Sequence, residues 1–423
     1  MGKDQKVLFI NPSRNLRKQN TNEPLWAESL AAVLERQNVY VQILDGTIKP
    51  ITESKIEGFN FVGVTTTTPQ YPIALSILKK IQKINSRSKN KIHTIIGGPH
   101  VTLVESISRD GWDTICVGEG EEIIGSIIKN KLQGRIIAKT IENLDKLPYP
   151  ARHLVDLNQY KRDGAEDTSI SIFGMRGCPY NCVYCASPLL GGKVRFRSPS
   201  NIIGEIDDVV AKYNIRNVCF YDQIFTLDRQ RVIKLCQGLK KRKIKWKCQT
   251  RVDRVDSQLL RMMHKSGCQE VSFGIESAHP DVVNFMNKGM GYSTEKAKEA
   301  ILMAKDAGLS IRAFFMFGFP VDSWKSVKSN LSFINETNPD IVRLSLLTPF
   351  PGTSIYSNAK KYGIELPSDM TRYQYYGPRG VSDSNLNPVI RKTKYLNEEE
   401  FQAALLVFQK GIAEWASRLD KSK

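Results

Sequence analysis

Three cysteines in one short stretch are the residues of this chain best suited to chemistry. Cys178, Cys182 and Cys185 stand within eight residues of one another. Iron–sulfur clusters are normally ligated by four cysteine thiolates, so a set of three can hold three irons of a [4Fe–4S] cube and leave the fourth iron open to another ligand. A zinc site usually has two separated pairs of cysteines or histidines, and no second pair follows here at such a spacing. A structural metal site, or three unrelated thiols, is the alternative.

The remaining five cysteines are scattered in apolar surroundings, where free cysteine is an ordinary core residue. We therefore interpret them as structural: Cys116, Cys219, Cys236, Cys248 and Cys268.

The spacing C-x-x-x-C-x-x-C, with Tyr184 directly before the last cysteine, resembles the radical S-adenosylmethionine (SAM) superfamily. The resemblance implies a [4Fe–4S] cluster whose open iron chelates SAM. An electron from the cluster would cleave the sulfonium, and the resulting 5′-deoxyadenosyl radical would take a hydrogen atom from the substrate. It also implies a reductant such as flavodoxin or ferredoxin.

The central part of the chain has the pattern of six strand–helix units. Six such units predict a partial (β/α)6 barrel, which is open where a full barrel has eight, with its active site at the carboxyl ends of the strands. The expected strands are 170–175, 217–222, 245–252, 270–275, 310–317 and 341–347.

Residues at these strand ends are the candidate SAM ligands. The resemblance implies that the end of the second strand contacts the methionyl amine, often through Gly-Gly-Glu, where this chain has Tyr221-Asp222-Gln223. It also implies that Glu276 accepts hydrogen bonds from the ribose hydroxyls, and a guanidinium such as that of Arg251 suits the SAM carboxylate. For each residue an ion pair or a surface role is the alternative. The candidates are Tyr184, Asp222, Gln223, Arg251, Glu276, Ser277, Phe317 and Gly318.

The N-terminal third alternates predicted strands with amphipathic helices. Ala27, Leu30, Ala31 and Leu34 fall on one helix face, and a second helix follows the same spacing from Ala74 to Ile81. This alternation predicts a doubly wound, Rossmann-like parallel sheet with ligands at the carboxyl ends of its strands. The expected strands are 6–13, 39–45, 61–65, 92–96 and 114–117.

The strand ends of this domain resemble the cobalamin-binding domain fused to one large branch of radical SAM enzymes. The matching runs are Ile-Asn-Pro after the first strand, Ile-Ile-Gly-Gly-Pro-His and Gly-Glu-Gly-Glu. No histidine precedes His93, so the Asp-x-His-x-x-Gly motif of classical cobalamin domains is absent and no histidine of that loop holds the lower face of the cofactor. A flavodoxin-like domain without a ligand is the alternative, and a loop contact is the alternative to an axial role for His100. The implied cobalamin contacts are Asn11, Thr65, Thr66, Thr67, Gly97, Gly98, His100, Gly118 and Glu119.

The chain of 423 residues is long enough for two or three domains. We expect a cobalamin-binding domain at 1–145, a linker at 146–169 that contains the run Leu-Pro-Tyr-Pro, a radical SAM barrel at 170–355 and a partly helical C-terminal region at 356–423.

The formal charge of +18 is spread along the chain in small groups, which favours a solvated surface and leaves the steering of an anionic substrate as the alternative. Nucleic acid is not an expected partner, because no arginine-rich tract with interleaved aromatics is present. No apolar run reaches the roughly 18 residues of a membrane span, and the N-terminus lacks the apolar core of a secretory signal. We expect a cytoplasmic protein, with a position peripheral to the membrane as the alternative.

The leading hypothesis is a cobalamin-dependent radical SAM enzyme that methylates an unactivated carbon of a small-molecule, peptide or lipid substrate. A radical cyclase, a rearranging enzyme or a lipid-modifying enzyme without methyl transfer is the main alternative, and a non-catalytic cobalamin or cluster sensor is another. A tRNA methylthiotransferase is disfavoured, because that family has a second cysteine trio and no trio precedes Cys178. The sequence names no catalytic acid or base.

Overall fold

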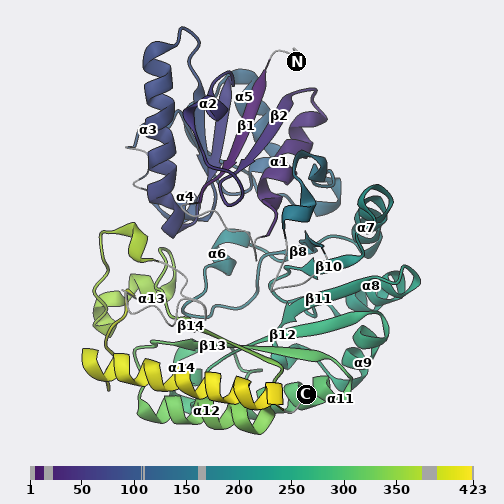
Figure 1. Cartoon of the computed structure of the whole chain (residues 1–423), viewed down its shortest axis with the longest axis vertical. Coiled ribbons are helices and arrows are strands. Elements are labelled where there is room, and N and C mark those ends of the chain that lie inside the picture. Colours follow the sequence, from purple (N-terminus) through teal and green to yellow (C-terminus); the bar gives the residue numbers. More distant parts are fainter. Residues whose placement is uncertain are drawn as a thin grey trace. The chain divides into compact units, whose positions relative to one another are not determined.

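The computed structural model describes residues 5–13, 22–105, 107, 110–160, 168–373 and 388–421. These residues form two compact units, coloured along the chain in Figure 1. The first unit contains the chain up to Ser171 together with 195–197 and 205–217, and the second contains 172–194, 198–204 and the chain from Val218 onward.

The first unit is built on a six-stranded parallel sheet with the order β2-β1-β3-β4-β5-β6. The strand order reverses between β1 and β3, and ligands of such sheets bind at the carboxyl ends of the strands next to this switch point. The strands are β1 (Lys6–Asn11), β2 (Tyr40–Asp45), β3 (Phe61–Thr65), β4 (His93–Gly97), β5 (Thr114–Val117) and β6 (Gly134–Ile137), and the helices are α1 (Leu25–Glu35), α2 (Glu53–Ile56), α3 (Tyr71–Arg87), α4 (Pro99–Leu103) and α5 (Ile124–Asn130).

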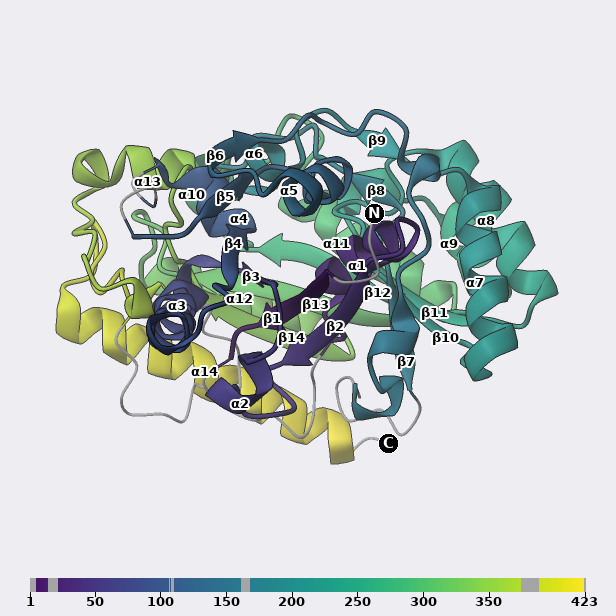
Figure 2. The same ribbon diagram turned by 90° about the horizontal axis from the view of Figure 1, so that it is seen from above.

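Alternating side chains explain why helices cover both faces of this sheet. Leu8 and Ile10 of β1 pack in one buried cluster with α3, whereas Val7 and Phe9 pack in another with α1 and α5. Successive residues of a strand point to opposite faces, so a run of apolar residues buries both. Viewed from above, α3 lies on one side of the sheet and α1 and α5 on the other (Figure 2).

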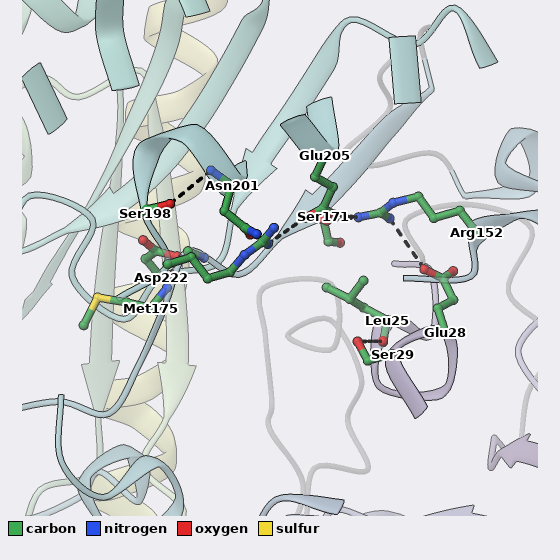
Figure 3. Close-up of polar contacts among 12 residues, drawn as sticks. Leu25, Glu28, Ser29, Arg152, Ser171, Met175, Ser198, Asn201, Glu205 and Asp222 are labelled. Atoms are coloured by element: carbon green, nitrogen blue, oxygen red, sulfur yellow. Dashed lines mark hydrogen bonds and ion pairs between the residues drawn. The ribbon is translucent and has the colours of Figure 1, made fainter. Parts of the chain in front are cut away.

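The segment predicted as a linker packs on α1 of the first unit. The backbone N–H of Ala151 donates to the carbonyl of Glu28 over 3.0 Å. The guanidinium of Arg152 lies among three buried carboxylates, at 3.2 Å from Glu23, 3.5 Å from Glu28 and 2.7 Å from Glu205 (Figure 3). Residues around Arg152 are therefore an integral part of this unit.

The second unit contains a six-stranded sheet with the order β14-β13-β12-β11-β10-β7, in which β11 to β14 pair in parallel. Strands β7 and β14 are the two edges of this order, which makes the sheet a partial barrel. Its strands are β7 (Ser169–Ile172), β10 (Asn217–Phe220), β11 (Lys245–Thr250), β12 (Cys268–Glu276), β13 (Ser310–Phe317) and β14 (Ile341–Leu346), and two short strands are β8 (Met175–Arg176) and β9 (Arg195–Phe196).

Helices follow the barrel strands along the chain. They are α6 (Ser187–Gly191), α7 (Pro199–Tyr213), α8 (Arg229–Lys241), α9 (Ser257–Lys265), α10 (Pro280–Met286), α11 (Thr294–Asp306), α12 (Trp324–Thr337), α13 (Ser354–Ser357) and α14 (Glu398–Lys421).

The two faces of the barrel strands differ in chemistry. On β12, Val271, Phe273 and Ile275 are fully buried. The alternate face carries Glu270 near the start of the strand, where it accepts two hydrogen bonds from Arg312 of β13 at 2.8 and 3.1 Å. The same face ends at Glu276, on the side where an active site is expected.

The C-terminal helix α14 packs on the barrel unit. It lies beside α12 (Figure 1). Phe401 and Phe408 contact the ring of Phe317, with centroid distances of 4.9 and 6.4 Å, and the indole N–H of Trp415 donates to the side chain of Asn338 over 2.9 Å. This helix therefore extends the hydrophobic core of the barrel.

The predicted α/β fold class, with a doubly wound N-terminal sheet and a partial (β/α)6 barrel, is confirmed. The predicted ranges of β3, β5 and β13 match the structure residue for residue. Strand β6 was not expected from the sequence, since its four residues are partly or fully exposed and lack a buried apolar run.

Candidate active site and cofactor sites

The three cysteines lie in the loop between β8 and α6. The loop starts at Gly177, whose φ of 85° lies in the left-handed region, and a Cβ there would stand 2.6 Å from the carbonyl oxygens of Gly192 and Lys193. Only glycine fits this approach. The backbone of Val183 bonds to Met286 and Ile355, at 3.1 and 2.9 Å. The loop is therefore anchored to the barrel on both sides.

The thiols of this loop are partly buried and close enough to influence one another. Burial raises the pKa of Cys178 and of Cys182, and the charge on Cys185 raises both further. The ammonium of Lys288 opposes this effect at Cys182, and the guanidinium of Arg251 opposes it at both. The loop thus places thiols that resist deprotonation next to two cations that favour thiolates.

The cysteine loop fits a cluster better than a single metal ion. Among the described residues, no three His, Cys, Asp or Glu side chains are arranged to hold one ion. In a [4Fe–4S] cube each thiolate binds a different iron, so the ligands need not converge on a point. Mutually interacting thiols with neighbouring cations are what such an anionic cluster requires.

Asp222 has a different position from the one expected of a SAM ligand. Its carboxylate is fully buried, accepts the N–H groups of Gly174 and Met175 at 2.5 and 3.1 Å, and pairs with Arg231 at 3.0 Å. Figure 3 shows Asp222 beside Met175. In this structure Asp222 fixes the turn that leads into the cysteine loop, and both of its oxygens already accept hydrogen bonds.

Gln223, the next residue, differs from Asp222 because its side-chain oxygen can still accept a hydrogen bond from a ligand. Its side-chain oxygen is buried and has no hydrogen-bond partner among the described residues. Buried polar atoms are normally hydrogen-bonded, so an orphan at the end of β10 indicates a place for a polar ligand group. This atom is an observation that fits the binding of SAM at this edge of the barrel.

Glu276 ends β12 with φ at 65°, a backbone conformation that costs a glutamate about 1–3 kcal/mol. The strain directs its carboxylate toward Lys288, whose ammonium lies 3.5 Å from Oε1. The hydroxyl of Tyr292 donates to the carbonyl of Ile275 over 2.6 Å and supports the turn. Strain held by such a network is typical of functional positions.

Arg251 pairs with a carboxylate of the chain itself and supports the cysteine loop. Its Nε and Nη2 bond to Asp253 at 2.8 and 3.0 Å, and Nη2 also donates to the carbonyl of Lys288 over 2.7 Å. The guanidinium stacks on the ring of Tyr180, in the cysteine loop, at 3.6 Å from its centroid. In this structure the Nε and Nη2 groups expected to pair with the SAM carboxylate are thus already bonded.

Two other candidates are buried by partners from other elements. Ser277 is fully buried, and its hydroxyl, expected to contact a ligand, donates to Asn330 of α12 over 3.1 Å. The ring of Phe317 packs under α14, which leaves only its backbone for a ligand.

Gly318 follows Phe317 with φ at 107°, and its N–H donates to Asp322 over 2.9 Å. Burial raises the pKa of Asp322 to about 6, against the opposing effect of the hydrogen bonds that it accepts. Tyr184 is half-buried, and its ring meets Phe319 edge-on at 5.7 Å. Burial raises the pKa of this tyrosine, so it stays a neutral phenol.

At the first unit, the ends of β3 and β4 form a tight backbone cradle. Gly98 has φ at 98°, and a Cβ on it would stand 2.3 Å from the hydroxyl of Thr65 and 2.9 Å from the N–H of Thr66. The hydroxyl of Thr66 is buried and has no hydrogen-bond partner among the described residues. Gly97 is partly exposed beside it. The close approach and the orphan hydroxyl fit a ligand at these strand ends.

The other predicted contacts of this edge are already bonded. Asn11 donates to Asp45 over 3.0 Å, and the hydroxyl of Thr67 donates to Gln70 over 2.8 Å. Glu119 accepts two hydrogen bonds from Arg195, at 2.7 and 2.9 Å. These side chains therefore bond to other residues of the unit and stabilise the loops at the edge of the sheet.

The N–H of exposed Gly118 donates to the hydroxyl of Thr102 over 3.1 Å. The loop after β1 lies outside the described residues from 14 to 21.

His100 is not placed as an axial ligand or as an exposed contact. It is only 1% exposed, its Nδ1 lies 3.2 Å from the hydroxyl of Thr68, and its ring contacts Tyr71 at 4.6 Å. Burial lowers its pKa to about 4, so it is neutral at pH 7. In this structure His100, expected as a cobalamin contact, is a core residue that packs α4 against Thr68 and Tyr71.

Sequence reasoning missed Lys288, Tyr180 and Asp253 of the barrel site. Lys288 comes between Asn287 and Gly289, both of which have positive φ, so a tight turn presents it. An Asn-Lys-Gly run directly after an apolar helix was the available signal.

Comparison with known families and proteins agrees with the fold. The description "Radical SAM superfamily" matches residues 172–334, and "B12 binding domain" matches residues 18–128. The two matches fall on the barrel and on the N-terminal sheet respectively.

Curated relatives cover most of the chain. An uncharacterized methyltransferase of Pyrococcus horikoshii is 27% identical over 93% of this chain and 89% of its own length. An anaerobic magnesium-protoporphyrin IX monomethyl ester cyclase of Rubrivivax gelatinosus is 25% identical over 83% and 69%. The bacteriochlorophyllide d C-12(1)-methyltransferase of Chlorobaculum tepidum is 24% identical over 78% and 72%.

Solved structures share the architecture. The cobalamin-dependent SAM radical enzyme OxsB, solved with aqua-cobalamin and SAM, superposes with a TM-score of 0.73 at 18% identity over 88% of this chain, which spans 64% of OxsB. The radical SAM methyltransferase TsrM from Kitasatospora setae gives a TM-score of 0.69 at 15% identity, over 97% of this chain and 89% of TsrM. At these identities the likeness shows the fold.

The chain therefore has a radical SAM domain and an N-terminal B12 binding domain, and it is an enzyme. These two domains imply a [4Fe–4S] cluster, SAM and cobalamin as cofactors. No described helix is long and apolar enough to span a membrane.

Proposed function

We propose that this protein is a cobalamin-dependent radical SAM methyltransferase that transfers a methyl group to an unactivated carbon. The observation that carries the proposal is the three-cysteine loop, anchored at the carboxyl end of a partial barrel, in a chain that also has a B12 binding domain. When bound, the cluster with SAM supplies a 5′-deoxyadenosyl radical, and cobalamin supplies the methyl group.

The chain's own residues would hold and orient these groups. Cys178, Cys182 and Cys185 would bind the cluster. Tyr184, Gln223, Glu276 and the backbone of Phe317 and Gly318 would bind SAM at the adjoining strand ends, and Thr65, Thr66, Gly97, Gly98 and Gly118 would form the cobalamin cradle.

An unactivated C–H bond offers no acidic proton and no electrophile, so no general acid or base is assigned. We propose the domain limits 1–145, 146–169, 170–355 and 356–423 for these roles, with the second segment packed on the first domain.

The substrate is proposed to be a small molecule, a peptide or a lipid, and the electron donor a flavodoxin or a ferredoxin. By name, one of the relatives is a cyclase and another is a methyltransferase, and both act on tetrapyrroles. The specific alternative to methyl transfer is therefore a radical reaction that transfers no methyl group.

The products of SAM distinguish the candidates. Protein purified without oxygen and reconstituted with iron, sulfide and cobalamin should, with dithionite, SAM and substrate, form both 5′-deoxyadenosine and S-adenosylhomocysteine. Deoxyadenosine alone would favour the cyclase type of reaction, and neither product from a cluster-loaded protein would favour a sensor. A loaded protein that never releases deoxyadenosine would overturn the proposal.

A further inference from the structure

A buried lysine occupies the side of the barrel that supports the cysteine loop. Lys288 is only 5% exposed, and its ammonium has three kinds of partner. It donates to the carbonyl of Gly274 over 2.6 Å, lies 3.5 Å from Oε1 of Glu276 and lies 4.4 Å above the ring of Tyr292. A carbonyl, a carboxylate and a ring face all favour the charged ammonium. The site is therefore built to keep a cation in place.

The backbone of the same segment is attached to the cysteine loop. The carbonyl of Met286 accepts the N–H of Val183, and the carbonyl of Lys288 accepts Nη2 of Arg251, whose guanidinium stacks on Tyr180. A Cβ on Gly289 would lie 3.4 Å from that tyrosine ring. These contacts come from both ends of one turn, so the position of Lys288 relative to the loop is fixed.

The turn that carries Lys288 is bonded on both sides of Cys182, directly to Val183 and through Arg251 to Tyr180. Gly274 leaves room for the ammonium of Lys288 and the carboxylate of Glu276, since a Cβ there would stand 2.6 Å from Oε1 of Glu276 and 3.6 Å from Nζ of Lys288. One cation therefore pairs with a strained carboxylate on a turn that is fixed beside the cysteine loop.

We propose that Lys288 is a positioning residue that sets the reduction potential of the cluster and holds the carboxylate of Glu276 in place for SAM. The proposal rests on the assignment of the three cysteines to a cluster. Reduction adds a negative charge, and a nearby fixed cation stabilises the reduced form more than the oxidised one. Lys288 therefore makes the cluster easier to reduce, while Glu276 moderates that effect.

The test is the midpoint potential of the cluster, measured by EPR-monitored titration without SAM on reconstituted full-length protein. Lys288→Met should shift the potential to more negative values, and Glu276→Gln should shift it to more positive values, because it leaves the lysine uncompensated. Lys288→Arg should stay near the parent. Lys247→Met is the matched control: it removes a cation from β11 that lies 3.7 Å from Glu270, and it should leave the potential unchanged.

A second measurement is the affinity for SAM by equilibrium dialysis. Lys288→Met should weaken it about tenfold, since a misplaced carboxylate loses one charge-assisted hydrogen bond, and Lys247→Met should not.

The outcomes separate this inference from the proposed function. In one outcome the parent binds the cluster and cleaves SAM, and both Lys288→Met and Glu276→Gln have full iron content and the midpoint potential of the parent. The role of Lys288 is then refuted, and the proposed function stands. If Lys288→Met loses iron, the Glu276→Gln shift alone decides: a positive shift supports the inference and no shift overturns it. A parent that binds no cluster refutes both.

Discussion

The carboxyl edges of the two sheets differ in how they prepare a ligand site. At the barrel, cations and aromatic rings from several strands and helices converge on one loop, and a strained Glu276 faces a buried Lys288. At the N-terminal sheet, most polar side chains are bonded to one another, and what stays available is backbone and a buried hydroxyl around Gly98. The barrel site is thus built from side-chain electrostatics, and the other from close backbone approach.

Removal of the three cysteines should have the largest effect on the barrel site. Replacement of Cys178, Cys182 and Cys185 by alanine should abolish iron binding and SAM cleavage, because no other group can hold the cube. Iron and sulfide analysis together with deoxyadenosine release check this. Cys219→Ala, a change to another partly exposed cysteine of the same unit, should retain both; activity in the triple variant would refute the cluster.

A neighbouring pair of residues sharpens the SAM assignment. Glu276→Ala should weaken SAM binding about 10- to 100-fold, since a hydrogen bond to a charged group is worth about 1.5–3 kcal/mol. Ser277→Ala should lower stability without this loss, because its hydroxyl bonds only within the core. Equilibrium dialysis against labelled SAM distinguishes them, and equal affinities for both variants would contradict the assignment.

The N-terminal edge should respond to backbone changes more than to its histidine. Gly98→Ala should cost about 1–3 kcal/mol of stability and reduce bound cobalamin, because φ is 98° and the new Cβ meets Thr65. His100→Gln should leave the absorption spectrum of bound cobalamin unchanged, since this residue is 1% exposed. A spectral change typical of a lost axial ligand would mean that the histidine reaches the cofactor.

The smallest expected effect is a pH dependence of the first unit. Burial raises the pKa of Glu28 to about 8 against the opposing charge of Arg152, and the negative charges of Glu23, Glu205 and Asp45 raise it further. A carboxyl whose folded pKa is raised binds more protons in the folded state, so stability is full below its ordinary pKa of 4.5 and falls as pH rises toward 8.

The slope for this one proton is at most about 1.4 kcal/mol per pH unit. Thermal unfolding at pH 6 and pH 8 should show a smaller difference in Glu28→Gln than in the parent. An identical difference in both proteins would show that Glu28 is not the group that titrates.

Much of the fold follows from local patterns. The continuous apolar run of β1 and the 3.6-residue period of α3 place their residues correctly, and β13 was predicted to the residue, because apolar patterning is a property of a short segment. Exposed β6 has no such pattern and forms because it pairs with β5.

The candidate site could be predicted from the sequence only in part. The sequence singles out the cysteine loop, since three thiols at this spacing need no tertiary information. It does not distinguish Asp222 from Gln223, which differ only because Arg231 and two backbone amides occupy the first and leave the oxygen of the second without a partner.

The sequence by itself determined the trio of thiols, the alternation of strands and helices, and hence the edge of each sheet where ligands are expected. Only the tertiary structure decided which polar residues at those edges stay available, that His100 is a core residue, and that Lys288 reaches the cysteine loop. The physical reason is that the burial and the pairing of a polar side chain depend on groups that belong to other elements. Lys288, for example, stands 12 residues after its partner Glu276. No local sequence pattern encodes such a pair.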